Sequence, residues 1–166
     1  MFNPDDVELR AALSCAYFNE GDFDEAQIAA SVVIEMNEND PMAHCNMGSI
    51  YSAKNMVEEA ILSFKKAMEL DPESSIPHTN LGSLYGSLNK VESAIKEFKY
   101  ATDLNPSDVN AWYNLYNCYK DIGRIQEAQE AYKKFEELSQ QAAGATPQDG
   151  DSSAEGVMHS MGGQKG

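Results

Sequence analysis

Three asparagines, Asn46, Asn80 and Asn114, are the side chains whose type and spacing point most clearly to chemistry. Each follows the previous one after 34 residues. A side-chain amide donates a hydrogen bond to a carbonyl and accepts one from an N–H group, and these are the two polar groups of a peptide backbone. Because such contacts transfer no proton, the pattern predicts recognition rather than catalysis.

Residues with metal-binding or catalytic potential lack a suitable arrangement. His44 and His78, with Cys45 beside the first, could suggest a metal site, since imidazole and thiolate are ligands of transition metals. The same position of the repeat described below holds Arg10 and Trp112, which favours a packing role. There is no phosphate-binding glycine loop, no nucleophile elbow and no ligand-spaced Cys/His cluster. The sequence therefore predicts no enzyme activity, no cofactor and no metal.

The asparagines belong to a repeat that must position them. Aligned at intervals of 34, the chain divides into units 7–40, 41–74, 75–108 and 109–142. Position 11 of every unit is tyrosine and position 20 is alanine: Tyr17, Tyr51, Tyr85 and Tyr119, then Ala26, Ala60, Ala94 and Ala128. Position 15 holds the two residue types that best tolerate the left-handed conformation at a helix end: Gly21, Asn55, Asn89 and Gly123.

Apolar residues within a unit recur at steps of three and four, which places them on one stripe of a helix. Each unit is therefore expected to be a helix, a tight turn and a second helix. We expect helices at 5–20, 22–37, 41–54, 56–71, 75–88, 90–104, 108–121 and 124–141. One such hairpin cannot bury its apolar face alone, so the units must stack. The predicted fold class is all-α, an α-solenoid.

This pattern resembles the tetratricopeptide repeat (TPR) family over residues 7–142. The resemblance implies a right-handed superhelix of four antiparallel helix-turn-helix units, whose first helices line a concave surface. It also implies which repeat positions face a ligand. The candidate peptide-binding residues are then Asn46, Asn80 and Asn114 at position 6, Ser49, Ser83 and Asn117 at position 9, Thr79 and Tyr113 at position 5, and Lys120 at position 12.

The three asparagines are similar to those of the asparagine-ladder TPR arrays, which bind extended peptides and include those preceding the O-linked N-acetylglucosamine transferase domain. Ala12 interrupts the row in the first unit. For each asparagine, solvation or a bond within the solenoid is the alternative. The carboxylate clamp of the chaperone-binding TPR branch is not matched, because Ala11, Cys15 and Ile76 stand where it needs lysine, asparagine and lysine.

Helix spacing suggests the form of the ligand. Packed helices lie roughly 8–10 Å apart. Three residues of a polyproline-II chain rise about 9.3 Å and return to the same face. We therefore expect an extended segment of about six to nine residues, bound chiefly through its backbone.

The formal net charge is −15, and residues 1–40 carry most of it, with ten acidic residues against Arg10 alone. An acidic chain repels phosphates, so the expected partner is a neutral to basic protein segment rather than nucleic acid or a membrane surface. The same charge could instead serve as a solubilising cap on the first unit.

No apolar run approaches the roughly 18 residues of a membrane span, and the start of the chain has no signal-peptide pattern. Cys15, Cys45 and Cys118 contain no close pair, which fits reduced thiols and a cytoplasmic location. Residues 143–166, rich in glycine and polar groups, are expected to form a flexible tail after a TPR domain at 1–142.

Three functions stay open. The leading hypothesis is an adaptor that binds an extended peptide in its concave groove. The second is a scaffold that self-assembles end to end through weak contacts between the acidic first unit and the last helix, where Tyr132 and Phe135 lack a neighbour. The third is the substrate-recruiting fragment of a larger transferase.

Overall fold

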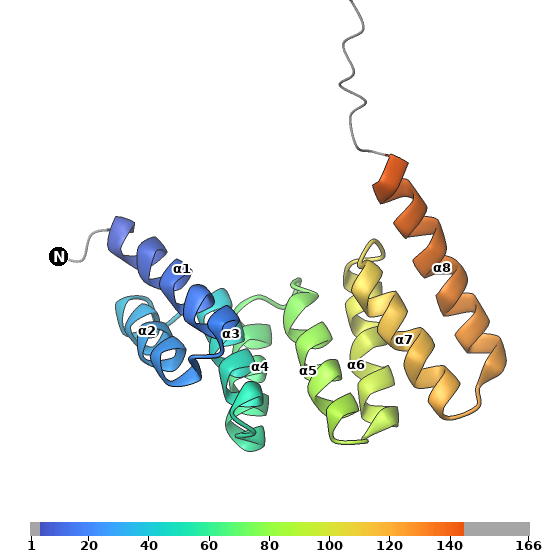
Figure 1. The fold of residues 1–166 in the computed structure, drawn as a ribbon, viewed down its shortest axis with the longest axis horizontal. Helices are drawn as coiled ribbons and strands as arrows, with labels where there is room; N and C mark the ends of the chain where they lie inside the picture. Colours follow the sequence, from blue (N-terminus) through green and yellow to red (C-terminus); the bar gives the residue numbers. More distant parts are fainter. Residues whose placement is uncertain (1–3, 145–166) are drawn as a thin grey trace, which may run out of the picture.

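A computed structural model of the chain describes residues 4–144, and all regular elements within that range are α-helices (Figure 1). They are α1 (Pro4–Glu20), α2 (Phe23–Met36), α3 (Pro41–Ala53), α4 (Val57–Leu70), α5 (Ile76–Ser87), α6 (Val91–Leu104), α7 (Val109–Asp121) and α8 (Ile125–Gly144). None of the helices between residues 4 and 144 is both long and apolar enough to cross a membrane.

The predicted all-α fold is confirmed, and most helix ends fall within one residue of the expected bounds. Several expected helices are one residue too long at one or both ends, because the expected ranges include the capping residues. Asp108, for example, is the N-cap of α7, and its side chain accepts hydrogen bonds from the N–H groups of Asn110 and Ala111. The last helix differs more: it runs to Gly144, so the first two residues of the expected tail are helical. The rest of that tail, 145–166, lies outside the described residues.

The tight turns between the paired helices have the predicted backbone. Gly21 and Gly123 have φ values of 86° and 74°, and Asn55 and Asn89 have values of 59° and 57°. All four lie in the left-handed region, which reverses the chain immediately after the first helix of each pair.

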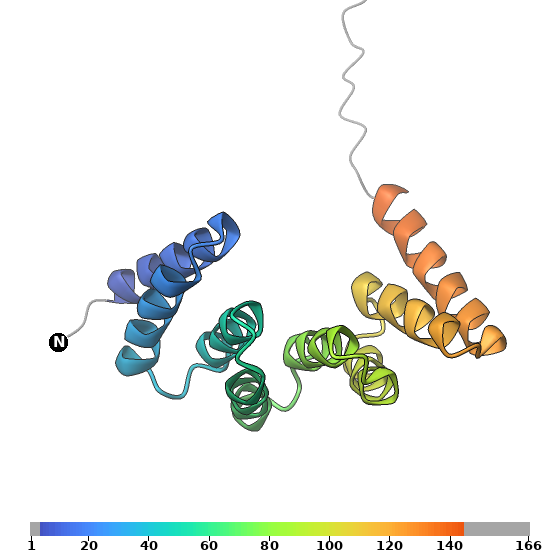
Figure 2. The same ribbon diagram turned by 60° about the horizontal axis from the view of Figure 1, so that its bottom comes forward.

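The helices form a curved array. Each helix packs against the next along the chain. Odd-numbered helices also contact the next odd-numbered helix, whereas no even-numbered helix contacts the next even-numbered one. The odd-numbered helices therefore lie closer together than the even-numbered ones, on the inner side of the curved array (Figure 2).

The packing between paired helices depends on glycine at position 8. A Cβ atom added at Gly48 would lie 2.7 Å from the ring of Phe64, and one at Gly82 would lie 2.8 Å from the ring of Phe98. Each ring thus rests against the backbone of the first helix. Each is buried together with a leucine of the following unit, Leu81 for Phe64 and Leu115 for Phe98. These contacts join one unit to the next.

Candidate peptide-binding groove

The three asparagines lie on the inner helices, Asn46 on α3, Asn80 on α5 and Asn114 on α7, and all are partly buried. The side-chain nitrogen of Asn80 donates across the junction to Ser49 Oγ at 3.3 Å and lies 3.4 Å from Cys45 Sγ. The Asn80 side-chain nitrogen therefore bonds within the solenoid, which is the alternative to ligand contact. No described residue donates to the Asn80 side-chain carbonyl oxygen, which leaves it available as an acceptor.

Two adjacent pockets open between successive inner helices. The Asn46 pocket, between α1 and α3, has a volume of about 320 Å³ and is lined by Ser14, Cys15, Phe18, Asn19, Asn46, Ser49 and Ile50. The Asn80 pocket, between α3 and α5, has a volume of about 270 Å³ and is lined by Phe18, Ser49, Ser52, Ala53, Phe64, Asn80, Ser83, Leu84 and Ser87. Phe18 and Ser49 line both pockets, so we treat the pair as one inner groove.

The inner groove brings together four of the predicted site residues, Asn46, Ser49, Asn80 and Ser83. Ser49 and Ser83 donate their hydroxyl hydrogens to carbonyl oxygens one turn earlier in their own helices, at 3.2 and 3.0 Å. Their oxygen lone pairs are then left for other donors, as Ser49 shows by accepting from Asn80. The floor of the groove is consequently rich in acceptors.

The lining of the groove carries no charged side chain. Cys45, directly beneath Asn80, is buried, and burial raises the pKa of its thiol from 9.0 to about 11, although the hydrogen bond from Asn80 acts in the opposite direction. The thiol is therefore neutral at physiological pH. Such a groove offers hydrogen bonds and apolar contact rather than charge.

Thr79 lies elsewhere. Its hydroxyl is 3.1 Å from Asp108 Oδ2 and 3.3 Å from the carbonyl oxygen of Ser75. Asp108 caps α7 through its other carboxylate oxygen. Thr79 therefore ties α5 to the start of α7 and lies outside the two groove pockets.

The predicted residues of the last unit are also separate from the groove. Tyr113 packs its ring 5.2 Å from that of Phe135 on α8, and Lys120 lies 5.5 Å from the centre of the Tyr116 ring. Asn114 and Asn117 are partly buried on α7 and line neither groove pocket. The groove as formed thus covers the first three units.

Sequence reasoning did not propose Phe18 and Ile50 as site residues. Phe18 occupies position 12, which the TPR resemblance implies to be ligand-facing, so the repeat alignment alone is enough to suggest it. Ile50 could not be found in that way, because its position is otherwise a core position and the residue is itself almost fully buried. Both give the Asn46 pocket an apolar wall.

The two histidines considered as metal ligands have separate partners. His44 Nε2 lies 2.8 Å from the carbonyl oxygen of Glu38, and His78 Nδ1 lies 2.8 Å from Glu97 Oε2. Over residues 4–144 no group of three His, Cys, Asp or Glu side chains could hold a metal ion.

Comparisons with known proteins agree with this architecture. Three family models described as tetratricopeptide repeat match residues 7–40, 41–74 and 79–149. No curated protein matches the chain in sequence.

Several solved structures share the fold. A crystal structure of MamA has a TM-score of 0.73 and 21% identity, over 86% of this chain and 83% of that one. PilF of Pseudomonas aeruginosa has a TM-score of 0.75 and 17% identity, over 82% of this chain and 62% of that one. The first TPR of Spaghetti (RPAP3), bound to the HSP90 peptide SRMEEVD, has a TM-score of 0.65 and 19% identity, over 73% of this chain and 96% of that one.

Proposed function

Since the chain belongs to the tetratricopeptide repeat family, we propose that it is a non-catalytic interaction module that binds an extended peptide segment in its inner groove. The observation that carries this proposal is the uncharged floor shared by Asn46, Ser49, Asn80 and Ser83. Amide and hydroxyl groups on such a floor match the N–H and C=O groups of a main chain whatever its side chains.

The groove supports backbone recognition in a specific way. The carbonyl oxygen of Asn80 is an acceptor for a peptide N–H group, while the Asn80 nitrogen is held by Ser49. Asn46 has no side-chain hydrogen bond to another described residue and can both donate and accept. We propose that Asn114 continues this row on α7, which would make the chain an asparagine-ladder array with 1–142 as the binding domain.

Side-chain selectivity would come from the apolar wall formed by Phe18 and Ile50 in the Asn46 pocket. A volume of about 320 Å³ is enough for one medium or large apolar side chain. We expect a ligand of about six to nine residues in polyproline-II or similar conformation, with one such side chain near its centre or end.

The expected ligand is neutral to basic overall. The RPAP3 structure contains a peptide with two glutamates and an aspartate, whereas the groove described here has no lysine or arginine in its lining. Residues 1–40 add a net charge of −9, from ten acidic residues and Arg10. An acidic peptide would therefore be repelled by the chain, and its binding would be electrostatically unfavourable. We propose a cytoplasmic location, where thiols such as the exposed Cys15 stay reduced.

Selection from a random peptide library tests the proposal. The wild-type chain should enrich extended sequences without an acidic C-terminus. A triple variant, Asn46→Ala with Asn80→Ala and Asn114→Ala, should fail to enrich the same sequences. Lys65→Ala, on the outer helix α4, is the matched control and should enrich them normally. Equal enrichment by the triple variant would remove the asparagine row from the binding site.

A further inference from the structure

The first helix exposes residues that are buried in every later unit. Leu9 and Leu13 of α1 occupy positions 3 and 7 of the repeat and are 68% and 40% exposed. The residues at these positions in the later units are all buried: Ala43, Pro77 and Ala111 at position 3, and Met47, Leu81 and Leu115 at position 7. With Ala16, the two leucines form one apolar stripe along α1.

The packing inside the array shows what such a stripe fits. Leu81 of α5 packs in one cluster with Phe64 of α4, and Leu115 of α7 packs in one cluster with Phe98 of α6. Position 7 of an inner helix thus contacts position 24 of the outer helix before it. Leu13 is the corresponding position 7 residue of α1.

The opposite end of the array exposes the complementary position. Tyr132 of α8 stands at position 24 and is 39% exposed, whereas Phe98 is 2% exposed. Phe98 is buried together with Leu115 of the following unit, whereas no described helix follows α8 to cover Tyr132. In addition, Tyr116 replaces the glycine of position 8, and the Tyr132 ring packs 5.0 Å from the Tyr116 ring. The two tyrosines and Ile125 line a C-terminal pocket of about 460 Å³ between α7 and α8.

We propose that the C-terminal pocket of one molecule receives α1 of a second copy of this chain, so that the repeat array continues from molecule to molecule. Leu13 of the second copy lies against Tyr132 of the first. The contact repeats the packing of position 7 on position 24 that already joins the units within one chain.

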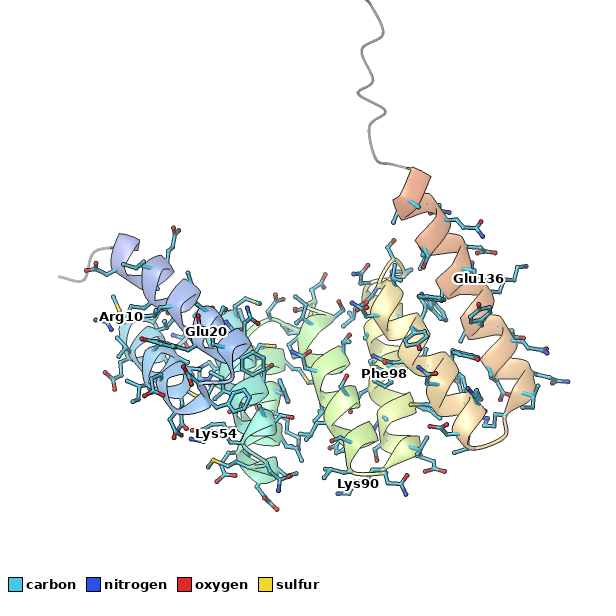
Figure 3. All side chains as sticks on the ribbon, viewed as in Figure 1. Arg10, Glu20, Lys54, Lys90, Phe98 and Glu136 are labelled. Atoms are coloured by element: carbon cyan, nitrogen blue, oxygen red, sulfur yellow. The ribbon has the colours of Figure 1, made fainter. Side chains whose placement is uncertain are left out.

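The charges on the two surfaces also favour α1 of a second copy in this alignment. Consecutive helices run in opposite directions, so the residues one turn before Leu13 face those one turn after Tyr132. These are Arg10 and Glu136, which carry opposite charges and lie at opposite ends of the array (Figure 3). In addition, the C-terminal pocket carries Lys120 and Lys133 against Glu136 alone, whereas residues 1–40, which include the approaching unit, have a net charge of −9 from ten acidic residues and Arg10.

Such an interface joins two different surfaces, so it leaves one free surface at each end and does not close a dimer. Sedimentation velocity on the full chain, from about 10 µM to about 1 mM, should show an average mass that keeps rising past the dimer with concentration. Leu13→Asp and Tyr132→Asp should each weaken association more than about tenfold, since each places a charge opposite an apolar partner.

Mixing the two variants gives the sharpest test. Leu13→Asp keeps an intact C-terminal pocket and Tyr132→Asp keeps an intact α1, so an equimolar mixture should form a dimer and stop there. Ile125→Asp changes an exposed residue of the same pocket and should weaken association as Tyr132→Asp does. Because Ile125 is exposed, its substitution should not disturb folding, and an unchanged far-UV circular dichroism spectrum of each variant checks this. A charge exchange, Arg10→Glu mixed with Glu136→Arg, should restore the association that each variant loses alone.

Three results would overturn the inference. One is a wild-type chain that stays monomeric throughout the concentration range. Another is a mixture of the two variants that stays monomeric or grows beyond a dimer. The third is a monomeric full chain whose truncation after Gly144 associates, which would assign the C-terminal pocket to residues 145–166 of the same chain.

Discussion

The side-chain nitrogen of Asn80 donates a hydrogen bond to Ser49 Oγ at 3.3 Å, linking the third unit of the array to the second across the floor of the inner groove. This bond fixes the orientation of the Asn80 amide, because the nitrogen must face α3. The side-chain carbonyl oxygen of Asn80 therefore has a fixed orientation. It accepts no hydrogen bond from any described residue. A preorganised acceptor loses less side-chain entropy when a ligand N–H group binds to it.

Asn80→Ala should weaken the binding of a library-selected peptide about three- to tenfold, the loss of one hydrogen bond worth roughly 0.5–1.5 kcal/mol net. Isothermal titration calorimetry measures the change. Lys65→Ala on α4 should leave the affinity unaltered. Ser49→Ala should have a smaller effect than Asn80→Ala, because it frees the amide without removing the acceptor. An Asn80→Ala variant with wild-type affinity would place the ligand elsewhere.

Two glycines of α5 should respond in opposite ways to alanine. Gly82→Ala should lower the free energy of unfolding by about 1–3 kcal/mol, since the new Cβ would meet the Phe98 ring at 2.8 Å. Gly86→Ala should raise it by about 0.5–1 kcal/mol, because no atom lies within 4 Å and alanine favours the helix. Urea denaturation of both variants checks the pair, and similar changes for the two would contradict the packing described.

The turn at Asn89 should tolerate glycine but not alanine. Its φ of 57° lies in the left-handed region, where an ordinary L-residue is disfavoured by roughly 1–2 kcal/mol. Asn89→Ala should therefore lower the melting temperature, while Asn89→Gly should leave it within a few degrees of wild type. Differential scanning calorimetry distinguishes them. Equal melting temperatures for the two variants would mean that the turn relaxes to another conformation.

Cys45 should make stability sensitive to high pH. Burial raises the pKa of its thiol from 9.0 to about 11, so between these values the unfolded chain is deprotonated while the folded chain keeps its proton. Stability is therefore fully present below pH 9.0 and lost as the pH rises toward 11, by at most roughly 2–3 kcal/mol. Other groups titrate there too, so the measured quantity is the difference in unfolding free energy between wild type and Cys45→Ala. That difference should shift in favour of Cys45→Ala as the pH rises, and a constant difference would contradict the burial effect.

The helices and the turns between them can be predicted from the sequence alone. Tyrosine and alanine at fixed positions, with glycine or asparagine at position 15, determine where each hairpin bends, and Asn55 and Asn89 have the left-handed backbone expected of them. These features are local, because they depend on the conformational preferences of a few neighbouring residues.

The candidate groove was harder to predict because its details depend on contacts between units. That Asn80 is bound to Ser49, and Thr79 to the helix cap at Asp108, follows from how closely two inner helices approach. The packing of Tyr132 on Tyr116, a residue sixteen positions earlier, follows from the absence at position 8 of the glycine against which Phe98 packs in the previous unit. The repeat alignment predicts the same role for residues at the same position, whereas contacts with neighbouring units give these residues different roles.

The most direct test of peptide binding in the inner groove is the response of the asparagine side-chain amides in a ¹⁵N nuclear magnetic resonance titration with a library-selected peptide. The resonances of Asn46, Asn80 and Asn114 should shift on binding, whereas those of Asn37 and Asn105, which end outer helices α2 and α6, should not. Shifts confined to Asn37 and Asn105, or absent from the three inner asparagines at saturation, would contradict the account.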